Sequence, residues 1–100
     1  MSSPLLDKSK AFALQIIKVC STIKSTKKES VLTNQLARSG TIVGANIREA
    51  FYAHGKAGFI AKLHIALKET AETEYWLKLL QLSEYIEEKQ ARLCWLIAWN

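Results

Sequence analysis

The sequence predicts an all-α protein, an up-down antiparallel four-helix bundle whose fourth helix is short. One hundred residues are enough for one domain, so residues 1–100 are taken as a single domain. Apolar residues make up 49% of the chain, which is too many for a disordered protein. Only four glycines and one proline leave little material for the tight turns of a sandwich or barrel. Apolar residues recur at helical spacing between short connectors, and short connectors make successive helices antiparallel.

The first helix is expected to open at Ser3-Pro4 and to run to about Thr26. Its apolar residues fall on one face at the i, i+4, i+7 spacing of a helix; they are Phe12, Ile16, Val19, Cys20 and Ile23. The segment 25–30 contains no apolar residue. It therefore predicts the connector to the second helix.

The second helix is expected to begin between Val31 and Asn34 and to carry its apolar stripe through Leu36, Val43 and Ile47. Gly40 and Gly44 lie four residues apart, on or beside this stripe. Each glycine costs about 1 kcal/mol of helix propensity relative to alanine. Close approach of a neighbouring helix of the same chain would offset that cost.

The third helix is expected over 59–82, after a glycine-containing turn at 54–58, and the fourth from about Glu87 to the end. Glu74 lies within the predicted inward stripe of the third helix, between Thr70 and Leu77. A buried carboxylate requires hydrogen-bonding partners. Gln35 or Ser39 is expected to partner Glu74, while Arg38 either reaches around to the third helix or contacts another subunit.

Two helices carry apolar residues opposite their expected core stripes. In the third helix these are Ile65, Trp76 and Leu79, and in the second helix they are Ile42 and Ala45. A helix that is apolar on two faces is buried on two sides, and one small bundle does not cover both. The pattern predicts a homo-oligomer.

Charge is distributed unevenly along the chain. Residues 1–68 carry eleven Lys and Arg against three acidic residues, a net charge of +8, whereas residues 69–100 carry −3. This asymmetry fits either an anionic partner for the first part or head-to-tail attraction between subunits. Lysine-rich surfaces with few aromatic residues contact phosphates without reading base sequence. The candidate nucleic-acid contacts are Lys8, Lys10, Lys18, Lys24, Lys27, Lys28 and Arg48.

The residues that enzymes and metal sites require do not occur in the necessary patterns. Cys20 and Cys94 lie far apart in the sequence and are expected to be buried thiols. His54 and His64 have no ligand at metal-binding spacing, and Gly40–Gly44 lacks the lysine of a phosphate-binding loop. We therefore expect no catalysis, cofactor or metal. The sequence also shows no signal peptide and no membrane span, which predicts a cytoplasmic protein.

Two long segments resemble one bacterial family. They are QLARSGTIVGANIREA at residues 35–50 and FIAKLHIALKETAETEYWL at residues 59–77. Both closely resemble the four-helix-bundle proteins called the 23S rRNA intervening-sequence protein family, and the resemblance spans nearly the whole chain. Members of this family are encoded within insertions in rRNA genes and have been labelled ribosomal proteins.

The resemblance implies partners as well as a fold. Related accessory proteins of diversity-generating retroelements form a positively charged pentameric barrel that binds reverse transcriptase and nucleic acid. A pentamer, RNA or DNA, and a reverse transcriptase are thus the implied partners. The family motifs themselves suggest structural roles, with Gly40 and Gly44 for close packing and Asn46 and Glu49 for polar contacts. Ile42 departs from the serine usual in the family, and the fourth helix is expected to end early.

Two functions remain open from the sequence. The first is a non-enzymatic, oligomeric protein that binds RNA or a protein associated with nucleic acid. The second is a homo-oligomeric scaffold that has no nucleic-acid role and whose basic charge is incidental. The residues assigned to structure or to an interface are Arg38, Gly40, Ile42, Gly44, Asn46, Glu49, Ile65, Glu74, Trp76 and Leu79.

Overall fold

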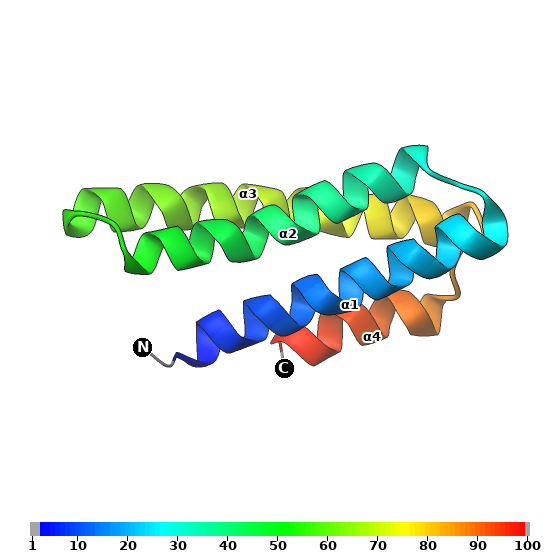
Figure 1. The fold of residues 1–100 in the computed structure, drawn as a ribbon, viewed down its shortest axis with the longest axis horizontal. Helices are drawn as coiled ribbons and strands as arrows, with labels where there is room; N and C mark the ends of the chain where they lie inside the picture. Colours follow the sequence, from blue (N-terminus) through cyan, green and yellow to red (C-terminus); the bar gives the residue numbers. More distant parts are fainter. Residues whose placement is uncertain (1–2, 100) are drawn as a thin grey trace.

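Four helices make up the fold of the computed structural model, which describes residues 3–99 and the side chains of residues 3–95. They are α1 (Pro4–Lys27), α2 (Val31–Phe51), α3 (Gly55–Leu82) and α4 (Glu88–Trp99), and no strand occurs within the described part. α2 and α3 lie side by side along the long axis, with α1 and α4 beside each other below them (Figure 1). α1 packs against α2, and α4 packs mainly against α1 and only slightly against α3. This arrangement is compatible with a helical bundle.

The start of α2 is fixed by a cap that the sequence reading did not assign. Lys28 adopts the left-handed conformation (φ 58°) that ends α1. The Glu29 carboxylate then accepts hydrogen bonds from the backbone N–H groups of Leu32 (2.8 Å) and Thr33 (3.0 Å). These N–H groups have no partner within their own helix, so the carboxylate stabilises the first turn of α2.

α3 begins four residues earlier than predicted. The turn expected at 54–58 is shorter, because Gly55 already starts the helix with a φ of +83° that glycine adopts without strain. Gly58, expected to lie in the turn, occupies the first turn of α3. The other helix boundaries agree with the predicted ones to within about one residue.

The main core lies where α1, α2 and the second half of α3 meet α4. Its fully buried side chains include Phe12, Ile16, Leu36 and Leu80. A smaller cluster of Val43, Ile47 and Ala66 lies nearer the α2–α3 turn; partly buried Leu5, Leu6, Phe51 and Leu63 pack against it.

Cys20 and Cys94 are free thiols within the main core, as predicted. Burial raises the pKa of the Cys20 thiol to about 11 and also raises the pKa of Cys94. The Cys20 thiol donates to the Thr33 carbonyl oxygen at 3.3 Å. Both cysteines remain protonated near neutral pH and act as small packing residues.

The predicted inward face of α3 is wrong in its middle section. Glu74 is exposed and Leu67 is 69% exposed, whereas Thr73 is fully buried. The Thr73 hydroxyl lies 2.9 Å from the Ser39 hydroxyl and donates to the Glu69 carbonyl oxygen at 2.7 Å. Because α3 is apolar on several sides, the apolar pattern alone did not fix its orientation. Ala66, Thr73, Leu77 and Leu80 form its buried face.

Candidate nucleic-acid interface

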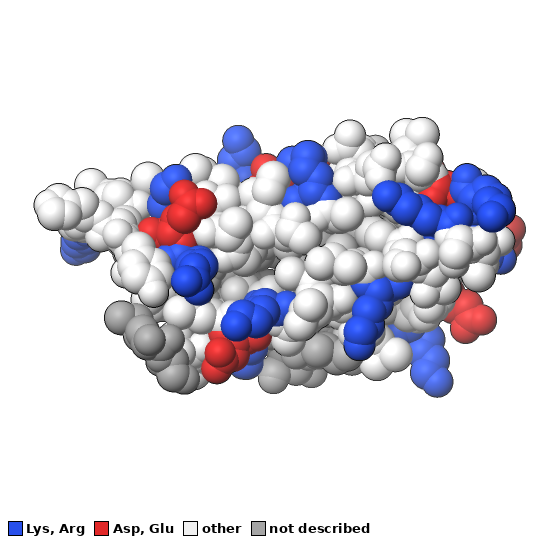
Figure 2. Space-filling view, in the orientation of Figure 1, with Lys and Arg blue, Asp and Glu red and all other residues white. Residues whose placement is uncertain are grey.

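The side of the molecule formed by α1 and α2, here called the α1–α2 face, carries most of the predicted phosphate contacts. The α1 lysines of the candidate set are all exposed; they are Lys8, Lys10, Lys18, Lys24 and Lys27. Figure 2 shows this face, with basic side chains along α1 and gathered at the end where the α1–α2 connector lies. Acidic side chains are fewer here. The face is therefore electropositive.

The connector end holds the densest part of the basic charge. Lys24 donates to the Asn34 side-chain oxygen, so one of the three lysines here has a neutral partner. Lys27 closes α1, and Lys28 follows it. The helix dipole favours lysines in the last turn of a helix. It therefore explains the occurrence of Lys24 and Lys27 at the end of α1 without any ligand. Glu29, the neighbouring acid, is engaged in capping α2. Lys27 and Lys28 form no ion pair within the described residues and extend into solvent.

Arg48 lies at the other end of α2 from the connector. It follows Val31 by seventeen helical steps, a distance of about 25 Å along the axis. Its guanidinium lies 5.4 Å from the centre of the Tyr52 ring, a cation–π contact. The seven candidate residues thus extend along the length of the bundle and do not form a compact pocket. Such a track suits contacts to a nucleic-acid backbone.

Arg38 reaches around α2 to α3, which was one of its two predicted alternatives. Its guanidinium forms ion pairs with Glu69, at 3.3 Å, and with Glu72. Glu72 also accepts a hydrogen bond from the Trp76 indole N–H at 3.0 Å. Trp76 was predicted to face away from the core, but it is half-buried and packs against the main core.

The α1–α2 contact is close because two glycines lie in it. A Cβ atom at Gly40 would lie 3.0 Å from Cγ2 of Ile16, and one at Gly44 would lie 3.4 Å from the Ser9 carbonyl oxygen. The two glycines therefore have the intrachain packing role predicted for them. Asn46 lies on the same helix and donates to the Ile42 carbonyl oxygen at 3.0 Å.

The remaining predicted interface residues have mixed surroundings. Glu49 forms an ion pair with Lys62 at 2.8 Å, which links α2 to α3. Ile42 and Leu79 are half-buried, and Ile65 is 41% exposed. Of the outward residues predicted on α3, Ile65 is thus the one that is largely open to solvent. Their role in an interface between subunits stays a prediction.

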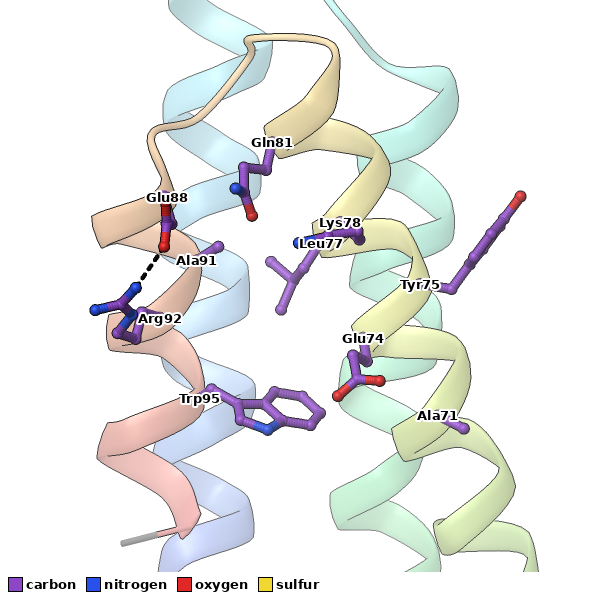
Figure 3. Close-up of a pocket in the computed structure, with 10 residues that line it drawn as sticks. All are labelled: Ala71, Glu74, Tyr75, Leu77, Lys78, Gln81, Glu88, Ala91, Arg92 and Trp95. Atoms are coloured by element: carbon purple, nitrogen blue, oxygen red, sulfur yellow. Dashed lines mark hydrogen bonds and ion pairs between the residues drawn. The ribbon is translucent and has the colours of Figure 1, made fainter.

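The opposite side of the molecule contains a groove between α3 and α4 with a volume of about 700 Å³. Ala71, Leu77, Ala91 and Trp95 form its apolar part. In Figure 3, Trp95 extends from α4 toward α3, and the Glu74 carboxylate points into the groove opposite it. Further polar rim residues are Lys78, Gln81, Glu88 and Arg92, with an ion pair between Glu88 and Arg92. The i, i+4 spacing of Ala91 and Trp95 was visible in the sequence but was not interpreted.

Within the described residues, no group of three or more His, Cys, Asp and Glu side chains is placed to hold a metal ion. None of the helices in that part of the chain has the length and apolarity needed to span a bilayer. His54 precedes α3, and His64 is exposed on it.

Taken together, these features define a small all-helical protein with a basic face on one side and an apolar groove on the other. The chain belongs to the 23S rRNA-intervening sequence protein family, whose sequence profile matches residues 3–95. It is similar to the crystal structure of a protein of unknown function from the S23 ribosomal protein family of Bacteroides thetaiotaomicron. The two share 47% sequence identity with a TM-score of 0.90, over 94% of this chain and 87% of the other. No curated protein matches the chain.

Proposed function

We propose that this chain is a non-enzymatic, homo-oligomeric protein of the cytoplasm that binds RNA through the backbone phosphates. The observation that carries the proposal is the exposed row of lysines along α1 and its connector, most of them without an acidic partner among the described residues. A family named after an intervening sequence of rRNA supports RNA as the ligand.

The proposal takes the bundle to be up-down and antiparallel. The connectors between successive helices are only three to five residues long, which supports this topology. The exposed lysines of α1 are distributed along the length of that helix, from Lys8 to Lys27. Phosphates are spaced along a strand, so lysines distributed over this length can contact several of them at once.

RNA binding is tested by the salt dependence of affinity. Each neutralised phosphate contributes about −0.7 to −0.9 to the slope of log K against log salt. We expect Lys27→Gln/Lys28→Asn to flatten this slope by roughly 1.5 units in fluorescence anisotropy with a labelled single-stranded RNA. Asparagine is chosen at position 28 because it tolerates the left-handed conformation found there.

The matched control removes two positive charges from α4. Lys89→Gln/Arg92→Gln is expected to change the slope much less, because these residues lie away from the α1–α2 face. Equal losses from both double variants would mean that net charge alone governs binding. Absence of RNA binding near 50 mM salt would favour the second function, a homo-oligomeric scaffold, which the apolar groove between α3 and α4 supports.

A further inference from the structure

Tyr52 exposes an aromatic ring at the α2–α3 turn. It follows α2 as the capping residue and is 72% exposed. The other two tyrosines have aromatic or core neighbours: the Tyr75 ring lies 5.2 Å from the Trp76 ring, and Tyr85 packs against the main core. The Tyr52 ring contacts a cation instead, the Arg48 guanidinium, 5.4 Å from the ring centre. This ring is therefore outside the core and has a charged partner.

The backbone that carries the Tyr52 ring is fixed. Its N–H group donates to the Glu49 carbonyl oxygen at 3.1 Å. The neighbouring Phe51 ring stacks edge to face on Phe59 with ring centres 5.9 Å apart, which joins the end of α2 to the start of α3. Figure 1 shows this turn at the opposite end of the bundle from the α1–α2 connector. A ring on a fixed backbone loses little conformational freedom when a ligand binds to it.

Arg48 and Tyr52 lie beyond the close contact of α1 with α2. A Cβ atom at Gly44 would lie 3.4 Å from the Ser9 carbonyl oxygen, so these two residues are level with each other. Lys10, which is exposed, follows Ser9 in α1. Arg48 and Tyr52 follow Gly44 by one and two helical turns, which is a rise of about 6 Å for every four residues. The pair thus extends the basic α1–α2 face toward the α2–α3 turn.

The surroundings of the Tyr52 ring are positively charged. Residues 50–68 contain three lysines and no acidic residue. One of these lysines, Lys56, is exposed in the first turn of α3. Glu49, the nearest acidic residue in the sequence, forms an ion pair with Lys62 at 2.8 Å. Arg48 has no acidic partner among the described residues. An anionic ligand is therefore favoured at this end of α2.

A nucleotide combines the two chemical groups that this pair can bind. Its base stacks on an aromatic ring, and its phosphate pairs with a cation. The guanidinium of Arg48 lies over one face of the Tyr52 ring, so the other face of this exposed ring is available to a base. Internal bases of a duplex are covered on both faces by their neighbours, whereas an unpaired base is free to stack on a side chain.

We propose that Tyr52 and Arg48 form a stacking platform for one unpaired base of a single-stranded RNA whose phosphates lie along the α1–α2 face. The inference rests on the proposed function and names its ligand class, which is single-stranded rather than duplex RNA. Tyr52 stacks on the base, while Arg48 holds the ring and pairs with the adjoining phosphate. Every base has a face that can stack, so the platform adds affinity without selecting a base sequence.

The experiment compares three variants of the full chain by fluorescence anisotropy with one labelled RNA, either single-stranded or annealed to its complement. Tyr52→Leu removes the ring and keeps an apolar side chain, and Tyr52→Phe keeps the ring. Tyr75→Leu is the matched control, because Tyr75 is also exposed but lines the α3–α4 groove. Both positions are exposed, so the helical circular dichroism of all variants is expected to match that of the wild type.

Tyr52→Leu is expected to weaken binding of the single strand about tenfold, the effect of losing one stacked base. The slope of log K against log salt should stay unchanged, because this substitution removes no charge. Tyr52→Phe and Tyr75→Leu should bind the single strand like the wild type. The duplex should bind Tyr52→Leu as tightly as it binds the wild type.

Three results would overturn the platform: wild-type affinity of Tyr52→Leu for the single strand, an equal loss for Tyr75→Leu, or an equal loss with the duplex. If Lys27→Gln/Lys28→Asn flattens the salt slope while Tyr52→Leu binds normally, RNA binding stands and the platform is refuted. If Tyr52→Leu weakens binding while Lys27→Gln/Lys28→Asn keeps the wild-type slope, the platform stands and the phosphate contacts at the connector are refuted.

Discussion

The α1–α2 contact and the α3–α4 contact are built in opposite ways. Between α1 and α2, the absence of side chains at Gly40 and Gly44 lets Ile16 and the Ser9 backbone approach within contact distance. Between α3 and α4, a groove of about 700 Å³ separates the helices, and Trp95 partly fills it. One pair of helices is thus closely packed, and the other is open on the outside.

The difference shows where this chain obtains its stability and where it keeps surface for binding. Most of the large fully buried side chains, Phe12, Ile16, Leu36 and Val43, come from α1 and α2, and Leu80 comes from α3. The groove holds apolar surface that is not covered by the same chain. An uncovered apolar groove with charged rims is typical of an interaction surface.

Truncation of the core at α1 is expected to have the largest effect. Phe12→Ala removes a fully buried ring and should lower the free energy of unfolding by about 3–5 kcal/mol. Trp95→Ala, in the half-buried wall of the groove, should cost roughly half as much despite its larger ring. Urea denaturation at one fixed protein concentration measures both losses, because association changes apparent stability. A greater loss for Trp95→Ala would contradict the contrast between the two contacts.

A side chain at Gly40 is expected to have an intermediate effect. Gly40→Val places a Cβ atom at 3.0 Å from Ile16, and forcing extra methyl groups into a packed contact costs about 1–3 kcal/mol. Ala45→Val on the exposed side of the same helix is the control, since it changes helix propensity without a neighbouring contact. Thermal unfolding of the two variants compares them. Equal melting temperatures would show that α1 and α2 are not in close contact at Gly40.

The smallest expected effects on stability come from replacing two glutamates of α3. Glu72→Ala removes an ion pair to Arg38 and a hydrogen bond from Trp76, and should cost about 1 kcal/mol. Glu74→Ala removes an exposed side chain at the groove and should cost under about 0.5 kcal/mol. Chemical denaturation of both variants shows which one loses more unfolding free energy. If Glu74→Ala proved the more harmful, Glu74 would be buried, as the sequence pattern had indicated.

Most of the fold could be predicted from the sequence because the main apolar stripes of α1 and α2 coincide with the buried faces of these helices. Phe12, Ile16, Leu36 and Val43 are buried as the stripes indicate. α3 could not be oriented in this way, since Leu67, Tyr75 and Leu82 are apolar or aromatic and yet exposed. The buried Thr73 hydroxyl lies against Ser39, 34 residues away, and the helical spacing of apolar residues does not indicate this pair.

The candidate surfaces were predictable to different degrees. The lysines of α1 were found from charge alone, because charged side chains are almost always exposed. The α3–α4 groove could not be found from charge or periodicity. It depends on α4 packing mainly against α1 and only slightly against α3, and on the small side chains of Ala71 and Ala91.

The salt dependence of RNA binding tests the central claim most directly, because the claim is that exposed lysines contact backbone phosphates. The affinity for a labelled single-stranded RNA is measured between about 50 and 200 mM salt for the wild type, for Lys27→Gln/Lys28→Asn and for Lys89→Gln/Arg92→Gln. We expect a flatter slope of log K against log salt for Lys27→Gln/Lys28→Asn and a nearly unchanged slope for the α4 variant. Equal slopes for the wild type and Lys27→Gln/Lys28→Asn would contradict the account.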